Sequence, residues 1–213
     1  MAKEPDGSGS EDYRMLLTVI AGLSLGVGAT ALPSLIEGPF ATWLFPAKLA
    51  MWLTGVAATV LEYLAVSFGS RLYLRRVEIF ATASLAFVFL AQAGMFAVLS
   101  LAPELLGSRW FFMFAVFNLF AGLEAEHARR VVIKHAGNRY PADLISRYAR
   151  SLRQVALLVG IAGVLSLIFA FAFGWWAPNW LIFIMATLAL ATTVAANLQQ
   201  RRIRDDLAEH GVS

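Results

Sequence analysis

Long apolar runs separated by short polar intervals make up most of this 213-residue chain. Six runs reach or approach the roughly 20 residues that cross a bilayer as a helix. None carries the polar stripe that a helix of a water-soluble protein needs on its outer face. The pattern therefore predicts six membrane helices, at about 15–36, 47–69, 77–101, 110–123, 155–173 and 181–198.

The longest polar interval, residues 123–154, separates the fourth and fifth predicted membrane helices. It contains seven of the 17 Lys and Arg residues. Its first part consists of good helix formers, which predicts that the fourth helix continues to about Gly137. Pro141 favours the start of another helix, which runs into the fifth membrane helix. We interpret residues 124–154 as a basic cytoplasmic loop.

The basic residues are divided unequally between the two sets of helix ends. Fifteen of the 17 lie in the two terminal tails, in 70–76 and in 123–154, whereas the opposite turns contain only Lys48 and Arg109. This bias predicts that both termini are cytoplasmic and that the protein lies in the plasma (inner) membrane. Five tryptophans occupy the opposite turns, as in an interfacial aromatic belt: Trp43, Trp110, Trp175, Trp176 and Trp180.

The predicted fold is an all-α, polytopic membrane bundle of six helices in three sequential hairpins. Residues 13–200 form the membrane domain. The polar segment 1–12 is expected to be a disordered tail, because it has too few apolar residues to pack. Residues 201–213 form a second cytoplasmic tail.

Composition supports this interpretation and removes several function classes. Hydrophobic residues make up 59% of the chain and charged residues 15%, against about a quarter charged in soluble domains. The net charge of +3 is explained by basic helix ends, so we expect no nucleic-acid partner. The chain has no cysteine, which excludes disulfides and thiolate sites. No nucleotide, phosphate or triad motif is present, and we expect no cofactor.

Glu62 is the strongest candidate functional residue. It lies about 20 Å beyond Lys48 along the second helix, inside the hydrocarbon region. An ionised carboxylate there costs at least a few kcal/mol unless it is paired or hydrated, which favours a position facing the bundle interior. The alternative is that it reaches the cytoplasmic interface. Gln92 and Asn118 are further permeation candidates, although such residues more often join helices by hydrogen bonds.

Glu124, Glu126 and His127 form a second candidate cluster at the start of the basic interval. Glu124 and His127 have the Glu-x-x-His spacing of di-iron bundle proteins. The motif occurs once where such sites need two, so we predict no metal site. Glu126 and Arg130 are four residues apart, which also suits a surface ion pair.

Two further features predict association. Gly22 and Gly26 form a small-xxx-small pair that allows close helix packing, within the chain or between subunits. In the basic interval, Leu144, Tyr148 and Leu152 form an apolar stripe, which suits a helix on an anionic inner leaflet or against a protein partner. The basic residues that would bind lipid or partner are Arg129, Arg130, Arg147, Arg150 and Arg153.

The function predicted from these features is a non-enzymatic membrane subunit for transport or permeation, acting as a homo-oligomer or with a protein partner. Anionic lipid headgroups at the cytoplasmic face are the other expected partner. One alternative is a membrane-anchored effector whose basic interval docks a soluble partner. A second is a membrane enzyme acting on lipid, with Glu124, Glu126 and His127 as acid or base.

Overall fold

The computed structural model describes residues 8–36, 43–73, 79–135 and 141–209, and this part of the chain contains helices and turns but no strand. The predicted all-helical class is confirmed. The helices are α1 (Ser8–Thr30), α2 (Leu32–Ile36), α3 (Leu44–Tyr73), α4 (Ile79–Val98), α5 (Pro103–His135), α6 (Ala142–Ala172) and α7 (Asn179–Glu209).

Five of the described helices are long and apolar enough to cross a membrane, as expected of a multi-pass membrane protein. These stretches are Met15–Ile36, Leu44–Ser67, Glu104–Lys134, Ala142–Ala172 and Asn179–Leu198. The third predicted membrane helix corresponds to α4. Its described apolar part, Thr82–Val98, is shorter than the others. At about 1.5 Å per residue it falls short of the roughly 30 Å hydrocarbon core, so five spans are supported where six were predicted.

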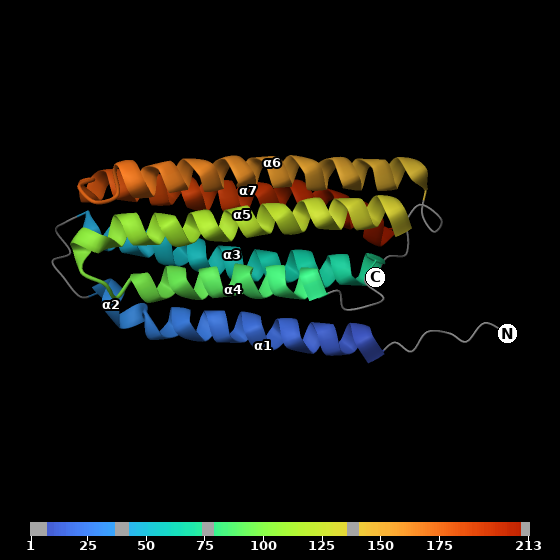
Figure 1. Ribbon diagram of the computed structural model, residues 1–213, viewed down its shortest axis with the longest axis horizontal. Helices are drawn as coiled ribbons and strands as arrows, with labels where there is room; N and C mark the ends of the chain where they lie inside the picture. Colours follow the sequence, from blue (N-terminus) through green and yellow to red (C-terminus); the bar gives the residue numbers. More distant parts are fainter. Residues whose placement is uncertain (1–7, 37–42, 74–78, 136–140, 210–213) are drawn as a thin grey trace.

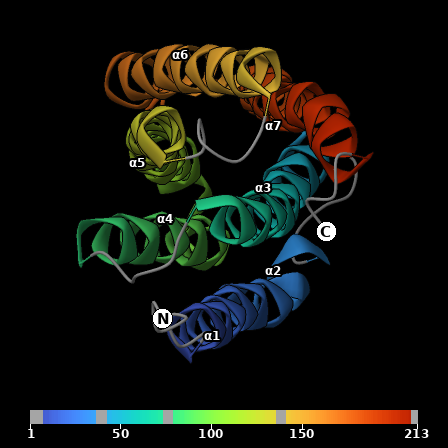
Figure 2. The ribbon, with the colours of Figure 1, turned by 90° about the vertical axis from the view of Figure 1, so that its right-hand side faces the viewer.

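The long helices run alternately in opposite directions along one bundle (Figure 1). The start of α1 and the end of α7 lie at the same end of the bundle, which is at the right of Figure 1. The end view shows α3, α5, α6 and α7 arranged around the interior, with α1 and α4 to one side (Figure 2). The most extensive packing joins α5 to α6, which belong to two different predicted hairpins.

Prolines determine several helix boundaries. Pro33 has no N–H with which to continue the hydrogen-bond ladder, and the helix is interrupted between α1 and α2. Pro103 opens α5, where the missing N–H costs nothing. Residues 103–109, which we predicted as a turn, are therefore helical. Pro141 precedes α6 as predicted.

Both terminal helices are longer than predicted. α1 begins at Ser8, so residues 8–12 are helical and do not belong to a disordered tail; residues 1–7 lie outside the described residues. α7 continues to Glu209, well past the predicted end of the last membrane helix. We call the end of the bundle where α1 and α6 begin and α5 and α7 end the basic end.

In the interval 123–154, residues 123–135 belong to α5 and residues 142–154 to α6, so these described parts are helical and not a loop. Residues 136–140 lie outside the described residues. The predicted helical continuations on both sides are confirmed. Its apolar stripe is buried, with Leu144, Tyr148 and Leu152 only 1%, 5% and 4% exposed. The prediction that this stripe faces a membrane surface or a partner is wrong, because packing inside the bundle already covers it.

The opposite end, which we call the tryptophan end, has exposed indoles and an aromatic core. Trp43, Trp175, Trp176 and Trp180 are exposed. Trp110 is fully buried, so its predicted place at the membrane interface is wrong. Its ring instead stacks on Phe114 with centroids 5.2 Å apart and meets Phe111 edge-on.

Glycines allow α1, α3 and α4 to pack closely, but these glycines are not the predicted pair of Gly22 and Gly26. Gly22 and Gly26 are exposed, and a Cβ at either would meet nothing within 4 Å. Their predicted packing role inside the chain is wrong, and a role between subunits stays a prediction. Gly28 of α1 and Gly55 of α3 instead border the Phe96 ring of α4. A Cβ would lie 2.9 Å from this ring at Gly28 and 2.7 Å at Gly55.

Candidate functional site

A cavity of about 90 Å³ lies between α3, α5, α6 and α7, and we call it the Glu62 cavity. It has room for several water molecules. Its lining contains polar side chains from all four helices. They are Glu62 of α3, Asn118 and Glu124 of α5, Tyr148 of α6, and Thr192, Thr193 and Asn197 of α7.

Small residues create this space. Alanines line α3 and α5 at positions where larger side chains would fill the interior: Ala58, Ala65, Ala121, Ala125 and Ala128. α5 and α6 meet closely beside it, since a Cβ at Gly122 would lie 3.4 Å from the carbonyl oxygen of Ala156. At Gly163 a Cβ would lie 3.3 Å from the carbonyl oxygen of Ala115. The close α5–α6 packing therefore fixes one wall of the cavity.

The two acids reach the cavity from different helices. Glu62 is partly buried and lies on α3, within the apolar stretch Leu44–Ser67. Glu124 is 9% exposed and lies on α5. We predicted Glu124 at the start of a cytoplasmic loop, and the structure places it inside the bundle. The predicted interior position of Glu62 agrees with its place in the lining.

Among the uncharged polar groups of the lining, Thr192 and Thr193 offer acceptor oxygens. The Oγ1 hydroxyls of Thr192 and Thr193 donate to the carbonyl oxygen of Ala189 at 2.9 and 2.8 Å. Their hydrogens are thus engaged, and only lone pairs remain for a ligand. Asn118 donates its amide nitrogen to the carbonyl oxygen of Phe114 at 2.7 Å, within its own helix. The predicted bond from Asn118 to another helix is therefore replaced by a bond within α5.

No Lys, Arg or His is among the described residues that line the cavity. Two carboxyl groups and several acceptor oxygens line one small volume, and none of the described residues that line it with them is basic. This chemistry suits a ligand that carries positive charge or donates hydrogen bonds, and it disfavours an anion.

A chain of aromatic rings extends from the cavity toward the tryptophan end. Phe117 lines the cavity and packs on Phe114 with ring centroids 6.1 Å apart. Phe114 stacks on Trp110, and Phe111 meets Phe169 of α6 edge-on at 4.6 Å. These five side chains are buried. Close-packed rings therefore fill the bundle between the cavity and that end.

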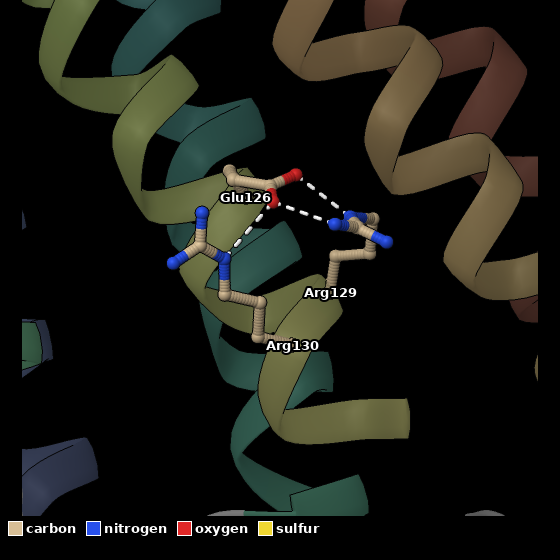
Figure 3. A network of polar contacts seen from close by, with 3 residues as sticks. All are labelled: Glu126, Arg129 and Arg130. Atoms are coloured by element: carbon tan, nitrogen blue, oxygen red, sulfur yellow. Dashed lines mark hydrogen bonds and ion pairs between the residues drawn. The ribbon is translucent and has the colours of Figure 1, made fainter. Parts of the chain in front are cut away.

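Of the predicted cluster of Glu124, Glu126 and His127, only Glu124 lines the cavity. Glu126 is held by two arginines of its own helix (Figure 3). Arg129 donates to both carboxylate oxygens at 2.7 Å, and Arg130 Nε donates to Oε1 at 3.0 Å. Neither Glu126 nor His127 lines the cavity. The predicted Glu126–Arg130 pair is confirmed, and Glu126 forms its ion pairs outside the cavity. The predicted acid–base role of Glu124, Glu126 and His127 stays a prediction.

The remaining predicted residues lie elsewhere. Gln92 is fully buried in α4 outside the cavity lining, and neither its amide nitrogen nor its oxygen bonds to a described residue. It does not make the predicted interhelical bond. The guanidinium nitrogens of Arg147 form ion pairs with the carboxylate oxygens of Asp143, at 3.6 Å, and of Asp206 on α7, at 3.4 Å. Arg150 and Arg153 are exposed on α6, as binding to lipid or a partner would require.

Sequence reasoning missed the contributions of α6 and α7 to the cavity. Tyr148 was assigned to a surface stripe, and Thr192, Thr193 and Asn197 were not singled out. Their polarity inside the last apolar run was the available signal. Across the described residues, no three His, Asp or Glu side chains gather as metal ligands. Comparison with known protein families, curated proteins and solved structures finds no match for this chain.

Proposed function

We propose that this protein is a membrane subunit for transport or permeation that binds a small cation in the Glu62 cavity. The observation that carries the proposal is the convergence of Glu62 and Glu124 on one cavity without a basic residue. Acidic side chains inside a membrane bundle are costly, and they commonly mark ion or proton pathways. The acceptor atoms of Asn118, Thr192 and Thr193 would replace part of the hydration of the cation.

The size of the cavity restricts the cargo. A volume of about 90 Å³ is well below the roughly 300–1,000 Å³ of pockets for drug-sized ligands. A proton, ammonium or a monovalent metal ion with few waters fits this limit. The aromatic chain between the cavity and the tryptophan end supports access from the basic end. In this scheme, passage through the protein requires Phe114 and its neighbours to move.

The membrane arrangement that accompanies this function is also a proposal. The protein crosses the plasma (inner) membrane six times, with α4 as the sixth span and both termini cytoplasmic. The 15 to 2 division of basic residues and the four exposed tryptophans at the opposite end support this orientation. A homo-oligomer or a protein partner completes the system, and Arg150 and Arg153 contact anionic headgroups at the basic end.

The test is current measurement on proteoliposomes adsorbed to a solid-supported membrane. Concentration jumps of Na⁺, K⁺, NH₄⁺ and H⁺ should produce a wild-type current for at least one cation. We expect Glu62→Gln and Glu124→Gln to reduce that current at least about tenfold, equivalent to about 1.4 kcal/mol on the barrier. Each substitution keeps the shape of the side chain and removes the carboxylate.

Glu126→Gln is the matched control, because it makes the same change on α5 outside the cavity. It should keep the wild-type current. The proposal fails if the wild-type protein carries none of these cations, or if the two cavity variants conduct as well as the control.

A further inference from the structure

We propose that the groove between α4, α5 and α6 at the tryptophan end binds an anionic phospholipid, with its phosphate on Arg109. The groove encloses about 480 Å³. It is a different surface from the Glu62 cavity, and the proposal does not depend on the transport function. Arg109 lines the groove in the second turn of α5, and Phe112 and Met113 follow it along the same helix.

Among the described residues, no ion pair compensates the charge of Arg109. Its side chain is exposed, the groove has no acidic lining residue, and no described residue forms an ion pair with it. Lys48, the other basic residue in the turns predicted at this end, is 6% exposed and donates Nζ to the carbonyl oxygen of Ser34 at 2.8 Å. A guanidinium at a membrane interface favours a phosphate oxygen, which it binds through charge-assisted hydrogen bonds.

The rest of the groove suits an acyl chain. Phe112 of α5 and Phe171 of α6 meet edge-on with ring centroids 6.1 Å apart. Both are exposed, at 39% and 68%. Trp175, 58% exposed, lines the groove on the α6 side, and indoles prefer the headgroup level of a bilayer. The charged group and the indole thus lie at the end of the bundle, and α5 continues from them with apolar side chains toward its middle.

Selectivity should come from the headgroup. Moving an acyl chain from the bilayer into an apolar groove gains little, because lipid tails are as apolar as leucine side chains. The contact with Arg109 is available to any phosphate, but a lipid with net negative charge also offsets the positive charge of the guanidinium. The expected ligand is therefore a lipid such as phosphatidylglycerol, in preference to zwitterionic phosphatidylcholine.

The experiment is native mass spectrometry of the purified full chain, delipidated and titrated with dioleoyl phosphatidylglycerol or dioleoyl phosphatidylcholine. The acyl chains are identical, so the comparison isolates the headgroup. We expect the wild-type protein to bind the first lipid at least about tenfold more tightly, equivalent to about 1.4 kcal/mol. Arg109→Gln should remove this preference, and Arg109→Lys should keep part of it.

Arg201→Gln is the control, because it removes an exposed arginine of α7 that neither proposal places on a lipid headgroup. It should keep the tight lipid site. Equal wild-type affinity for the two lipids would overturn the proposal, as would an unchanged preference in Arg109→Gln. Loss of the preference in Arg201→Gln with its retention in Arg109→Gln would place the lipid at the basic end and overturn it too.

Discussion

Acidic residues of this protein have two contrasting environments. Glu126 forms ion pairs with Arg129 and Arg130, of which Arg130 is 74% exposed, and such solvent-exposed pairs contribute at most about 1 kcal/mol. Glu62 and Glu124 instead line an interior cavity without basic neighbours in its lining. Interior carboxyl groups lower stability unless a partner side chain, a ligand or water compensates them. Their presence there is consistent with selection for function at a cost in stability.

This contrast gives a prediction for Glu62. Glu62→Gln should lower cation transport while the melting temperature in detergent stays equal to or above that of the wild type, because an interior charge is removed. Glu62→Ala should lose transport as well. The measurement is thermal unfolding by intrinsic fluorescence beside the transport assay. If Glu62 had a purely structural role, Glu62→Gln would transport normally and Glu62→Ala would be strongly destabilised.

Helix packing in this bundle depends on a few small residues. Phe96 of α4 fits against Gly28 of α1 and Gly55 of α3, where the added Cβ positions lie 2.9 and 2.7 Å from its ring. Contacts this short require the ring or a helix to shift. By contrast, Gly22 faces open space on the outer side of α1. All three positions are glycines, but only Gly28 and Gly55 make a packing contact within the chain.

Alanine substitutions should therefore act in opposite directions. Gly55→Ala should lower the free energy of unfolding by about 1–3 kcal/mol through overpacking. Gly22→Ala should be neutral or stabilising by up to about 1 kcal/mol, since alanine is the better helix former. Thermal unfolding of the two variants in one detergent measures both effects. Equal melting temperatures would show that Phe96 relaxes without cost. A change of oligomer size in Gly22→Leu alone would support the predicted contact between subunits.

Over the whole molecule, the bundle has two chemically different ends. The tryptophan end has exposed indoles and a filled aromatic interior. The basic end has the helical extensions of α5, α6 and α7, and the Glu62 cavity lies between these regions. Arg147 of α6 lies 3.4 Å from Asp206 of α7, so the extensions also contact each other. This polarity supports a fixed orientation in the membrane.

Single cysteines in this cysteine-free chain should report that orientation. Ser100 is exposed near the α4–α5 turn, and Ser146 is exposed on α6 at the basic end. An impermeant thiol reagent added to intact cells should label Ser100→Cys and leave Ser146→Cys unlabelled until the membrane is permeabilised. The reverse pattern would invert the proposed topology. Ser108 is unsuitable as a probe, because it is 5% exposed.

The sequence by itself determined the helices and many of their ends. Runs of apolar residues specify helices in a membrane, because every backbone group must be bonded within the segment. Pro141 marks the start of α6, as the sequence predicted. The cost of a carboxylate in hydrocarbon also predicted that Glu62 faces the interior.

Only the tertiary structure decided which faces meet. Lipid and protein interior are both apolar, so the sequence pattern of a membrane helix does not distinguish the side facing lipid from the side facing another helix. Trp110 was therefore placed at the membrane interface when it is buried in the core. For the same reason, Glu124 was predicted at the start of a loop and Tyr148 on an apolar stripe at the surface of that interval. Their meeting with Glu62 depends on the packing of α3, α5, α6 and α7, which joins residues too far apart in sequence for any local pattern to relate them.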